Sequence, residues 1–146
     1  MLRLRGGFTP SGFNFNSCED QVNGSFAKNA PDWRVVVDGL NMEGTHPSDS
    51  CKASGQKDVI AHFGIGSYNI GQLQASSKCM LCKTALSDVH NMIFSRCGFT
   101  IEGEQEGKND AIKKESRTPP DGFSTFKDET DAEMVKWKWM QVTTKH

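Results

Sequence analysis

The sequence predicts a β-rich domain, all-β to α+β, built from short antiparallel strands that are joined by long polar loops. The chain has 146 residues, about the length of one domain. Hydrophobic residues make up 36% of it, and 14 glycines and five prolines divide the apolar stretches into short segments. Between these breaks, β-branched or alternating segments recur, as is typical of strands. The resulting core is small, so we expect it to need support beyond packing.

The strand pattern recurs along the second part of the chain. Residues 33–37 are β-branched and bounded by proline and glycine, and residues 58–63 form a second such segment. Gly64 and Gly66 then indicate a bulge or a close approach. Residues 93–101 alternate imperfectly, residues 123–126 are a short strand, and residues 135–139 alternate cleanly and close the sheet.

The remaining segments are expected to lie outside the sheet. We divide the chain into a short tail over residues 1–7, a flexible tail over residues 8–31 and a β-rich domain over residues 32–146. Phe13 and Phe15 are expected to dock the flexible tail locally. Residues 72–78 and the charged residues 102–121 are interpreted as loops, the second with a short helical turn near residues 110–114.

Charge and hydropathy exclude several classes of protein. Seventeen basic and 18 acidic side chains give a formal net charge of −1, which argues against a general nucleic-acid binder. No apolar run approaches the ~20 residues that span a bilayer. The first residues lack the apolar segment of a secretory signal. These features predict a cytoplasmic or nuclear protein with no membrane partner.

The cysteines carry the most specific chemistry in the sequence. Cys79 and Cys82 are separated by two residues, a spacing that lets both thiolates of one tight turn bind the same ion. His46 and Cys51 offer a second pair in a turn-rich stretch. The sequence therefore predicts one tetrahedral, structural zinc ion held by His46, Cys51, Cys79 and Cys82, which makes the domain similar to a zinc knuckle or ribbon. Cys97 is the alternative fourth ligand in place of His46.

These residues also fit other interpretations. A Cys-x2-Cys pair can also be a redox centre, but no βαβ unit surrounds it here. A catalytic zinc would need an open position and a nearby carboxylate, for which Glu43 and Asp49 are the closest in sequence. Cys18 is expected to keep a reduced thiol outside the site, and His62 to be a core or edge residue of a strand.

The N-terminal segment is unusual. Residues 2–7 read Leu-Arg-Leu-Arg-Gly-Gly, which resembles the C-terminal tail of ubiquitin. A glycine pair can enter a narrow protease cleft because it has no side chains. The resemblance implies that a deubiquitinase recognises Gly6 and Gly7 and cuts the Gly7–Phe8 bond. The cut would release a C-terminal extension from an upstream ubiquitin domain.

From Gly12 onward, the chain resembles a poorly characterised group of zinc-binding proteins of protists and invertebrates, sometimes found downstream of ubiquitin-like sequence. That resemblance implies a zinc ion and a β-rich fold, but no activity. The group usually has cysteine at position 46, and some members have one near position 92 that is absent here. The matching segments are Gly12-Phe-Asn-Phe-Asn16, Gly39-Leu-Asn-Met-Glu-Gly44, Cys51-Lys-Ala53, Val59-Ile60, Gly64-Ile-Gly66, Cys79-Met-Leu-Cys82-Lys83, Phe94-Ser-Arg-Cys97, Glu102-Gly103, Gly122-Phe-Ser-Thr-Phe126 and Val135-Lys-Trp-Lys-Trp139.

Together these features predict a non-enzymatic, zinc-binding module with an adaptor role toward a protein partner. One alternative is a RING-like component of a ubiquitin ligase, which would need eight ligands from a chain that has five cysteines and four histidines. Another is an RNA- or ribosome-binding module. The alternation of Lys136 and Lys138 with Trp137 and Trp139 offers it a stacking strip, although burial of the tryptophan row is the simpler expectation.

Overall fold

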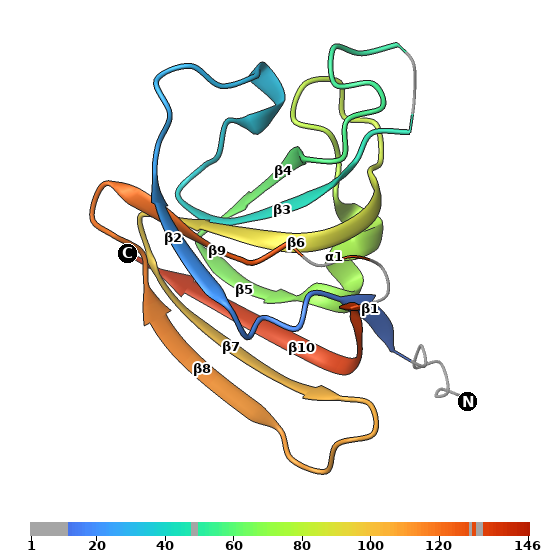
Figure 1. Cartoon of the computed structure of the whole chain (residues 1–146), viewed down its shortest axis with the longest axis vertical. Helices are drawn as coiled ribbons and strands as arrows, with labels where there is room; N and C mark the ends of the chain where they lie inside the picture. The colour runs from blue at the N-terminus through green and yellow to red at the C-terminus, as the bar shows by residue number, and fades with distance from the viewer. Residues whose placement is uncertain (1–11, 48–49, 129, 131–132) are drawn as a thin grey trace.

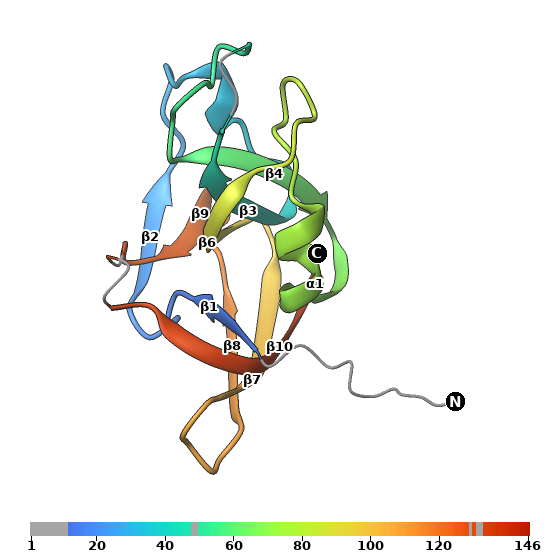
Figure 2. The same cartoon turned by 90° about the vertical axis from the view of Figure 1, so that its right-hand side faces the viewer.

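The computed structural model describes residues 12–47, 50–128, 130 and 133–146. They form two antiparallel five-stranded sheets that pack face to face (Figures 1 and 2). The β-rich class with antiparallel strands is confirmed, whereas the sequence indicated one sheet and the structure has two. Sheet A has the order β1 (Phe13–Phe15), β10 (Val135–Lys145), β7 (Gly98–Gln105) and β8 (Ile112–Arg117), and β5 (Gly66–Asn69) also pairs with β10. Sheet B has the order β2 (Gln21–Ser25), β9 (Gly122–Phe126), β6 (Ser87–Ser95), β3 (Gly39–Thr45) and β4 (Val59–Gly64).

The core lies between the two sheets. Buried and partly exposed residues alternate along β7 and β9, whereas nearly every residue of β3 is buried. The largest fully buried side chain is Trp137 on β10. Phe94 of sheet B stacks on Phe99 of sheet A, with ring centroids 3.9 Å apart. The other large, fully buried side chains are Phe15, Phe126, Leu40, Met42, Ile60, Ile70, Met92, Ile101 and Met140.

Several expected elements are present. The strand expected at residues 58–63 is β4, the one at 123–126 is β9, and the one at 135–139 is the first part of β10. The close approach expected at Gly64 is also confirmed, because a side chain on Gly39 would lie 2.3 Å from the Gly64 carbonyl carbon. Among the described residues, there is no helix that is long and apolar enough to cross a membrane.

The expectation of a flexible tail over residues 8–31 is wrong from Gly12 onward, because this segment contributes two strands to the sheets. β1 pairs with the start of β10, and β2 pairs with β9 along all five of its residues. Phe15 is fully buried, whereas the segment had been expected only to dock. Residues 1–11, including Gly6 and Gly7, lie outside the described part of the chain.

The strand expected at residues 33–37 is also wrong. The 3-10 turn η2 (Asp32–Arg34) stands there, with the Arg34 amide donating to the Pro31 carbonyl at 2.9 Å. The Asn41 side chain accepts from the Val37 amide at 2.9 Å and donates to the Val37 carbonyl at 2.8 Å. The Asn41 side chain therefore satisfies the backbone groups of Val37 that a neighbouring strand would otherwise pair with, and β3 begins only at Gly39.

Three further expectations are corrected. Residues 93–101 belong to two strands, β6 and β7, because the chain turns at Arg96 (φ +46°) and passes from sheet B to sheet A. Residues 112–117, expected in a charged loop with a helical turn, form the edge strand β8, whose charged side chains suit a solvent-facing edge. Residues 72–78, expected as a loop, lie mostly in α1 (Ile70–Ser76), which the Asn69 side chain caps by accepting from the Gln72 amide at 3.3 Å.

Candidate metal centre

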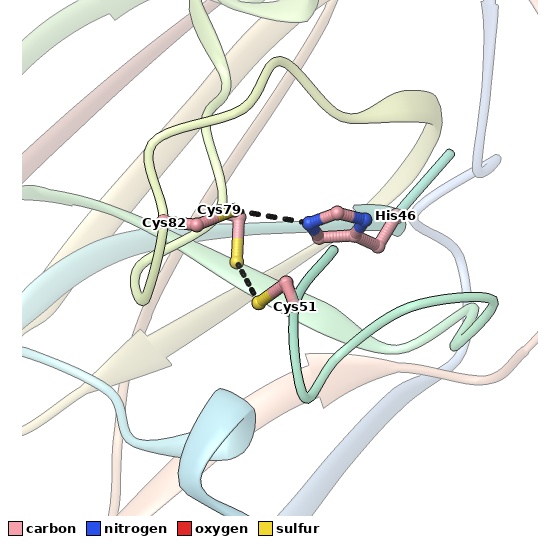
Figure 3. Close-up of side chains that lie close together, drawn as sticks. All are labelled: His46, Cys51, Cys79 and Cys82. Atoms are coloured by element: carbon pink, nitrogen blue, oxygen red, sulfur yellow. Dashed lines mark hydrogen bonds between the residues drawn. The ribbon is translucent and has the colours of Figure 1, made fainter. Parts of the chain in front are cut away.

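Two loops at one end of the sandwich bring four ligand-type side chains together. The loop between β3 and β4 carries His46 and Cys51, and the loop between α1 and β6 carries Cys79 and Cys82. One ligand atom from each residue lies within 4.8 Å of all the others. Figure 3 shows the four side chains pointing toward one another across the gap between the loops. These are the same four residues that the spacing predicted, and they could hold one metal ion.

The loop that carries Cys79 and Cys82 is closed by its own backbone. The Cys79 amide donates to the Thr84 carbonyl at 2.8 Å, and the Lys83 amide donates to the Cys79 carbonyl at 2.9 Å. Lys83 has a φ of +67°, which reverses the chain directly after the second cysteine. The Leu81 amide also points at the Cys79 sulfur, 3.4 Å away. An amide directed at the sulfur stabilises the thiolate form and so opposes the effect of burial on Cys79.

The loop that carries His46 and Cys51 is built in a similar way. The His46 amide donates to the Gln56 carbonyl at 2.9 Å, and the Gly55 amide donates back to the His46 carbonyl at 3.1 Å. The Ala53 amide lies 3.5 Å from the Cys51 sulfur, matching the amide–sulfur contact of the other loop. Ser48 and Asp49, and with them one carboxylate considered for a catalytic zinc, lie outside the described residues.

Direct contacts join the two loops. His46 Nε2 lies 3.1 Å from the Cys82 sulfur, and the sulfurs of Cys51 and Cys79 are 4.0 Å apart. His46 and Cys79 are buried, whereas Cys82 is exposed. The Met80 amide donates to the Ile60 carbonyl of β4 at 3.2 Å, which ties the cysteine loop to sheet B. The cluster therefore has a buried side against the sheet and an open side at Cys82.

The two cysteines of the Cys-x2-Cys pair have different acidities. The hydrogen bond to the Thr84 hydroxyl, and then the contact with His46, lowers the pKa of Cys82 to about 6. Burial raises the pKa of Cys79, although hydrogen bonds from its own loop oppose that effect. A bound cation would favour the thiolate form of both, because metals bind the deprotonated sulfur.

The structure does not bring the alternative ligand Cys97 to this cluster. Cys97 is fully buried beyond the end of β6, where its amide donates to the Thr118 hydroxyl at 3.0 Å. Its neighbours include Gly39, at the start of β3, whereas His46 follows the end of that strand. A strand of seven residues is about 20 Å long, so one ion cannot reach both sites.

The other candidate residues lie away from the cluster as well. Cys18 is buried, with its amide donating to the Asn16 side chain at 2.7 Å. His62 is an exposed residue of β4, and its Nε2 lies 2.6 Å from the Val35 carbonyl oxygen. The Glu43 carboxylate, considered as a base for a catalytic zinc, forms an ion pair with Arg34 instead. Four protein ligands are typical of a structural metal site.

A second group of ligand-type side chains was missed by sequence reasoning. Glu43 on β3, His90 on β6 and Asp128 after β9 place one ligand atom each within 4.8 Å of one another. No short spacing links these residues, so only the pairing of β3 with β6 and of β6 with β9 makes them neighbours.

Comparison of the chain with protein-family models, with curated proteins and with solved structures finds no match.

Proposed function

We propose that this protein is a non-enzymatic zinc-binding module in which one structural zinc ion joins the β3–β4 loop to the α1–β6 loop. The observation that carries the proposal is the convergence of His46, Cys51, Cys79 and Cys82 within 4.8 Å. Two of these ligands come from each loop, so a bound ion would cross-link segments that are 36 residues apart at the His46–Cys82 contact.

The donor set favours zinc. Three thiolates and one imidazole form a common tetrahedral zinc site, and the mixed set is less suited to iron–sulfur clusters, which take cysteine almost throughout. Hard cations such as Mg²⁺ and Ca²⁺ prefer oxygen ligands, of which the cluster has none. Four protein ligands would also fill the coordination shell, which supports a structural rather than a catalytic ion.

We further propose an adaptor role, in which the metal-bound loops form a contact surface for a protein partner. Leu81 lies between the two cysteines and is 38% exposed, and Val35 on the neighbouring η2–β3 segment is 54% exposed. Exposed apolar side chains on a loop that metal binding holds rigid are suited to contact another protein at low entropic cost.

The alternatives have weaker support. A RING needs two zinc ions and eight ligands, whereas the described residues gather only four cysteine and histidine side chains at one centre. The stacking strip for RNA is half absent, because Trp137 is fully buried and only Trp139 is exposed. A register shift lies between Trp137 and Trp139, which explains why only Trp137 points into the core although the two residues are two positions apart.

The experiment is metal analysis of the full chain. Native mass spectrometry of protein loaded with excess zinc and then exchanged into metal-free buffer should show one tightly held ion, and Co²⁺ in its place should show the strong thiolate-to-metal absorption of a tetrahedral sulfur site. Cys79→Ser should remove both signals, while Cys18→Ser should keep them. Failure of the wild-type chain to bind zinc tightly, or two thiolate-bound ions per chain, would overturn the proposal.

We propose in addition that residues 2–7 act as a processing signal when a ubiquitin domain precedes them. The support is the Leu-Arg-Leu-Arg-Gly-Gly sequence alone, since these residues lie outside the described part of the chain. In this proposal a deubiquitinase is a transient partner, and the zinc-binding module is the product that it releases.

A further inference from the structure

The three side chains Glu43, His90 and Asp128 form a site that is separate from the cysteine cluster. They come from two adjacent strands of sheet B and from the segment that follows β9. Glu43 is 6% exposed, His90 is half-buried and Asp128 is exposed. The group therefore runs from a buried carboxylate outward to the surface, with an imidazole as its third member.

The hydrogen bond on the far side of the His90 ring fixes its orientation. His90 Nδ1 lies 2.6 Å from the Asp88 carbonyl oxygen, which can only accept, so Nδ1 carries a hydrogen. The other nitrogen, Nε2, faces the Glu43 carboxylate with 3.5 Å between Nε2 and Oε1. Metal-binding histidines are held in this way, with one ring nitrogen donating to a carbonyl and the other turned to the ion.

The Nε2–Oε1 separation fits two ligands of a shared ion. Hydrogen bonds between nitrogen and oxygen are usually about 2.7–3.2 Å long, shorter than the distance found here. Two ligand atoms at about 2.1 Å from one metal ion lie about 3–3.5 Å apart when the angle at the metal is tetrahedral or octahedral. The geometry thus leaves room for a cation between His90 and Glu43, with Asp128 within reach.

Arg34 holds the Glu43 carboxylate in place. Its Nη1 donates to Glu43 Oε2 and also to the Asp58 carbonyl at 2.8 Å, so Glu43 keeps Oε1 for another partner. The charge of Arg34 is shared with the Asp58 carboxylate, 3.8 Å from its Nε. Carboxylates that bind metals are commonly hydrogen-bonded on their second oxygen in this manner.

An open cavity of about 340 Å³ adjoins Glu43 and Asp128, which line it together with Asn91, Thr125 and the cationic side chains of Arg34 and Lys127, whereas His90 is not one of its lining residues. Three protein ligands fill only part of the coordination shell of a divalent metal, so water or a small ligand in the cavity would occupy the remaining positions. The oxygen–nitrogen–oxygen donor set accepts Mn²⁺ as well as Zn²⁺, whereas the thiolate cluster discriminates against Mn²⁺.

We propose that Glu43, His90 and Asp128 form a second metal site, which binds an exchangeable divalent transition-metal ion with open coordination positions toward the cavity. This site does not depend on the cysteine centre, because it shares no residue with it. It adds a ligand-accessible ion to a module whose other metal is structural, and the ligand would be a small oxygen donor such as a carboxylate.

The test is titration of the zinc-loaded full chain with Mn²⁺, which electron paramagnetic resonance follows as loss of the free-ion signal. We expect one Mn²⁺ per chain and enhanced relaxation of water protons, because water occupies the open positions. Asp128→Asn and His90→Gln should each weaken Mn²⁺ binding by about tenfold or more. Loss of a group that only hydrogen-bonds to a metal ligand already lowers metal affinity about 10–100-fold, and loss of the ligand itself should cost at least as much. Thiolate-bound zinc should stay unchanged in both variants.

Asp88→Asn is the matched control. It removes a carboxylate two residues from His90 but keeps the backbone carbonyl that His90 contacts, and asparagine tolerates the φ of +46° at that position. It should leave Mn²⁺ affinity unchanged. The proposal is overturned if Mn²⁺ does not bind the wild-type chain, in which case the group is an imidazolium–carboxylate ion pair. It is also overturned if Asp128→Asn and Asp88→Asn weaken binding equally, because the effect is then one of surface charge.

Discussion

His46 Nε2 and Cys82 Sγ lie 3.1 Å apart, although one residue follows the third strand and the other precedes the sixth. The imidazole is buried and the thiol is exposed, so the pair connects the inside of the molecule with its surface. This contact also lowers the pKa of Cys82, second to the effect of Thr84.

The first prediction concerns the fourth ligand. His46→Ala should weaken zinc binding by more than about 100-fold, because even the loss of a partner behind a ligand costs 10–100-fold. Cys97→Ala should leave the affinity unchanged, since Cys97 lies at the other end of β3. Competition with a chromogenic chelator measures both constants. The reverse pattern would place Cys97 in the site and contradict the geometry described here.

The second prediction concerns removal of the metal. Zinc present at about a thousand times its dissociation constant adds about 4 kcal/mol to the free energy of unfolding. For a domain of this size, chelation should then lower Tm by about 10 °C. Amide hydrogen exchange should rise first in the loops over residues 46–58 and 77–86, while β7 and β10 stay protected. An unchanged Tm after complete chelation would show that no metal stabilises the fold.

The third prediction concerns the pH dependence of stability. Burial raises the pKa of Cys97 to about 11 from an ordinary value of 9.0. Between these values the folded chain keeps the Cys97 proton and the unfolded chain loses it, so stability falls as pH rises from about 9 toward 11. Cys97→Ala should flatten this part of the curve, measured by urea unfolding at several pH values. An equally steep decline in the variant would assign the effect to other groups.

The fourth prediction concerns the segment that the sequence had placed in a flexible tail. Asn16→Ala should lower the free energy of unfolding by about 1–3 kcal/mol, because it leaves buried partners unsatisfied. The Asn16 side chain donates to the Lys127 carbonyl at 2.9 Å and accepts from the Cys18 amide at 2.7 Å. Asn14→Ala is the control, since that side chain is exposed on β1, two residues before Asn16. Equal effects of the two changes in urea unfolding would mean that the Asn16 hydrogen bonds add little to the stability.

The fifth prediction concerns processing. In a fusion with a complete ubiquitin domain, a deubiquitinase should cut the Gly7–Phe8 bond, and the product should begin at Phe8. Gly7→Val should block cleavage, because its side chain does not fit a cleft shaped for glycine. Zinc content should not change, since none of the four cluster residues is altered. N-terminal sequencing of the product is the measurement, and a product that begins elsewhere would reject the proposal.

Local patterns in the sequence account for much of the metal centre. The two-residue spacing of Cys79 and Cys82 and the turn around His46 and Cys51 predicted the cluster that the structure assembles. Such pairs are recognisable because each is built within one turn, where neighbours in sequence are neighbours in space. The group at Glu43, His90 and Asp128 has no such signal, because strand pairing alone brings its members together.

The sheet was predictable in class but not in every element. The alternation of β9 and β10 identified them, since each has one face against the core. The break at Arg96 was missed because a positive φ at a non-glycine residue leaves no trace in composition. At residues 33–37 the valines favoured a strand, yet two hydrogen bonds between the Asn41 side chain and the Val37 backbone, four residues away, override that preference.

The pairing of β1 with β10 has a consequence for the separation of the two ends of the molecule. Phe13 lies beside Trp137, near the start of β10, while His146 directly follows the last residue of that strand. His146 is nine positions beyond Trp137, so this part of the chain is about 30 Å long at about 3.3 Å per residue. A fluorophore or a second domain attached next to Gly12 would be held about 30 Å or slightly less from another attached at His146. The sandwich would then act as a stiff spacer, and its dimension could be read directly as an energy-transfer distance.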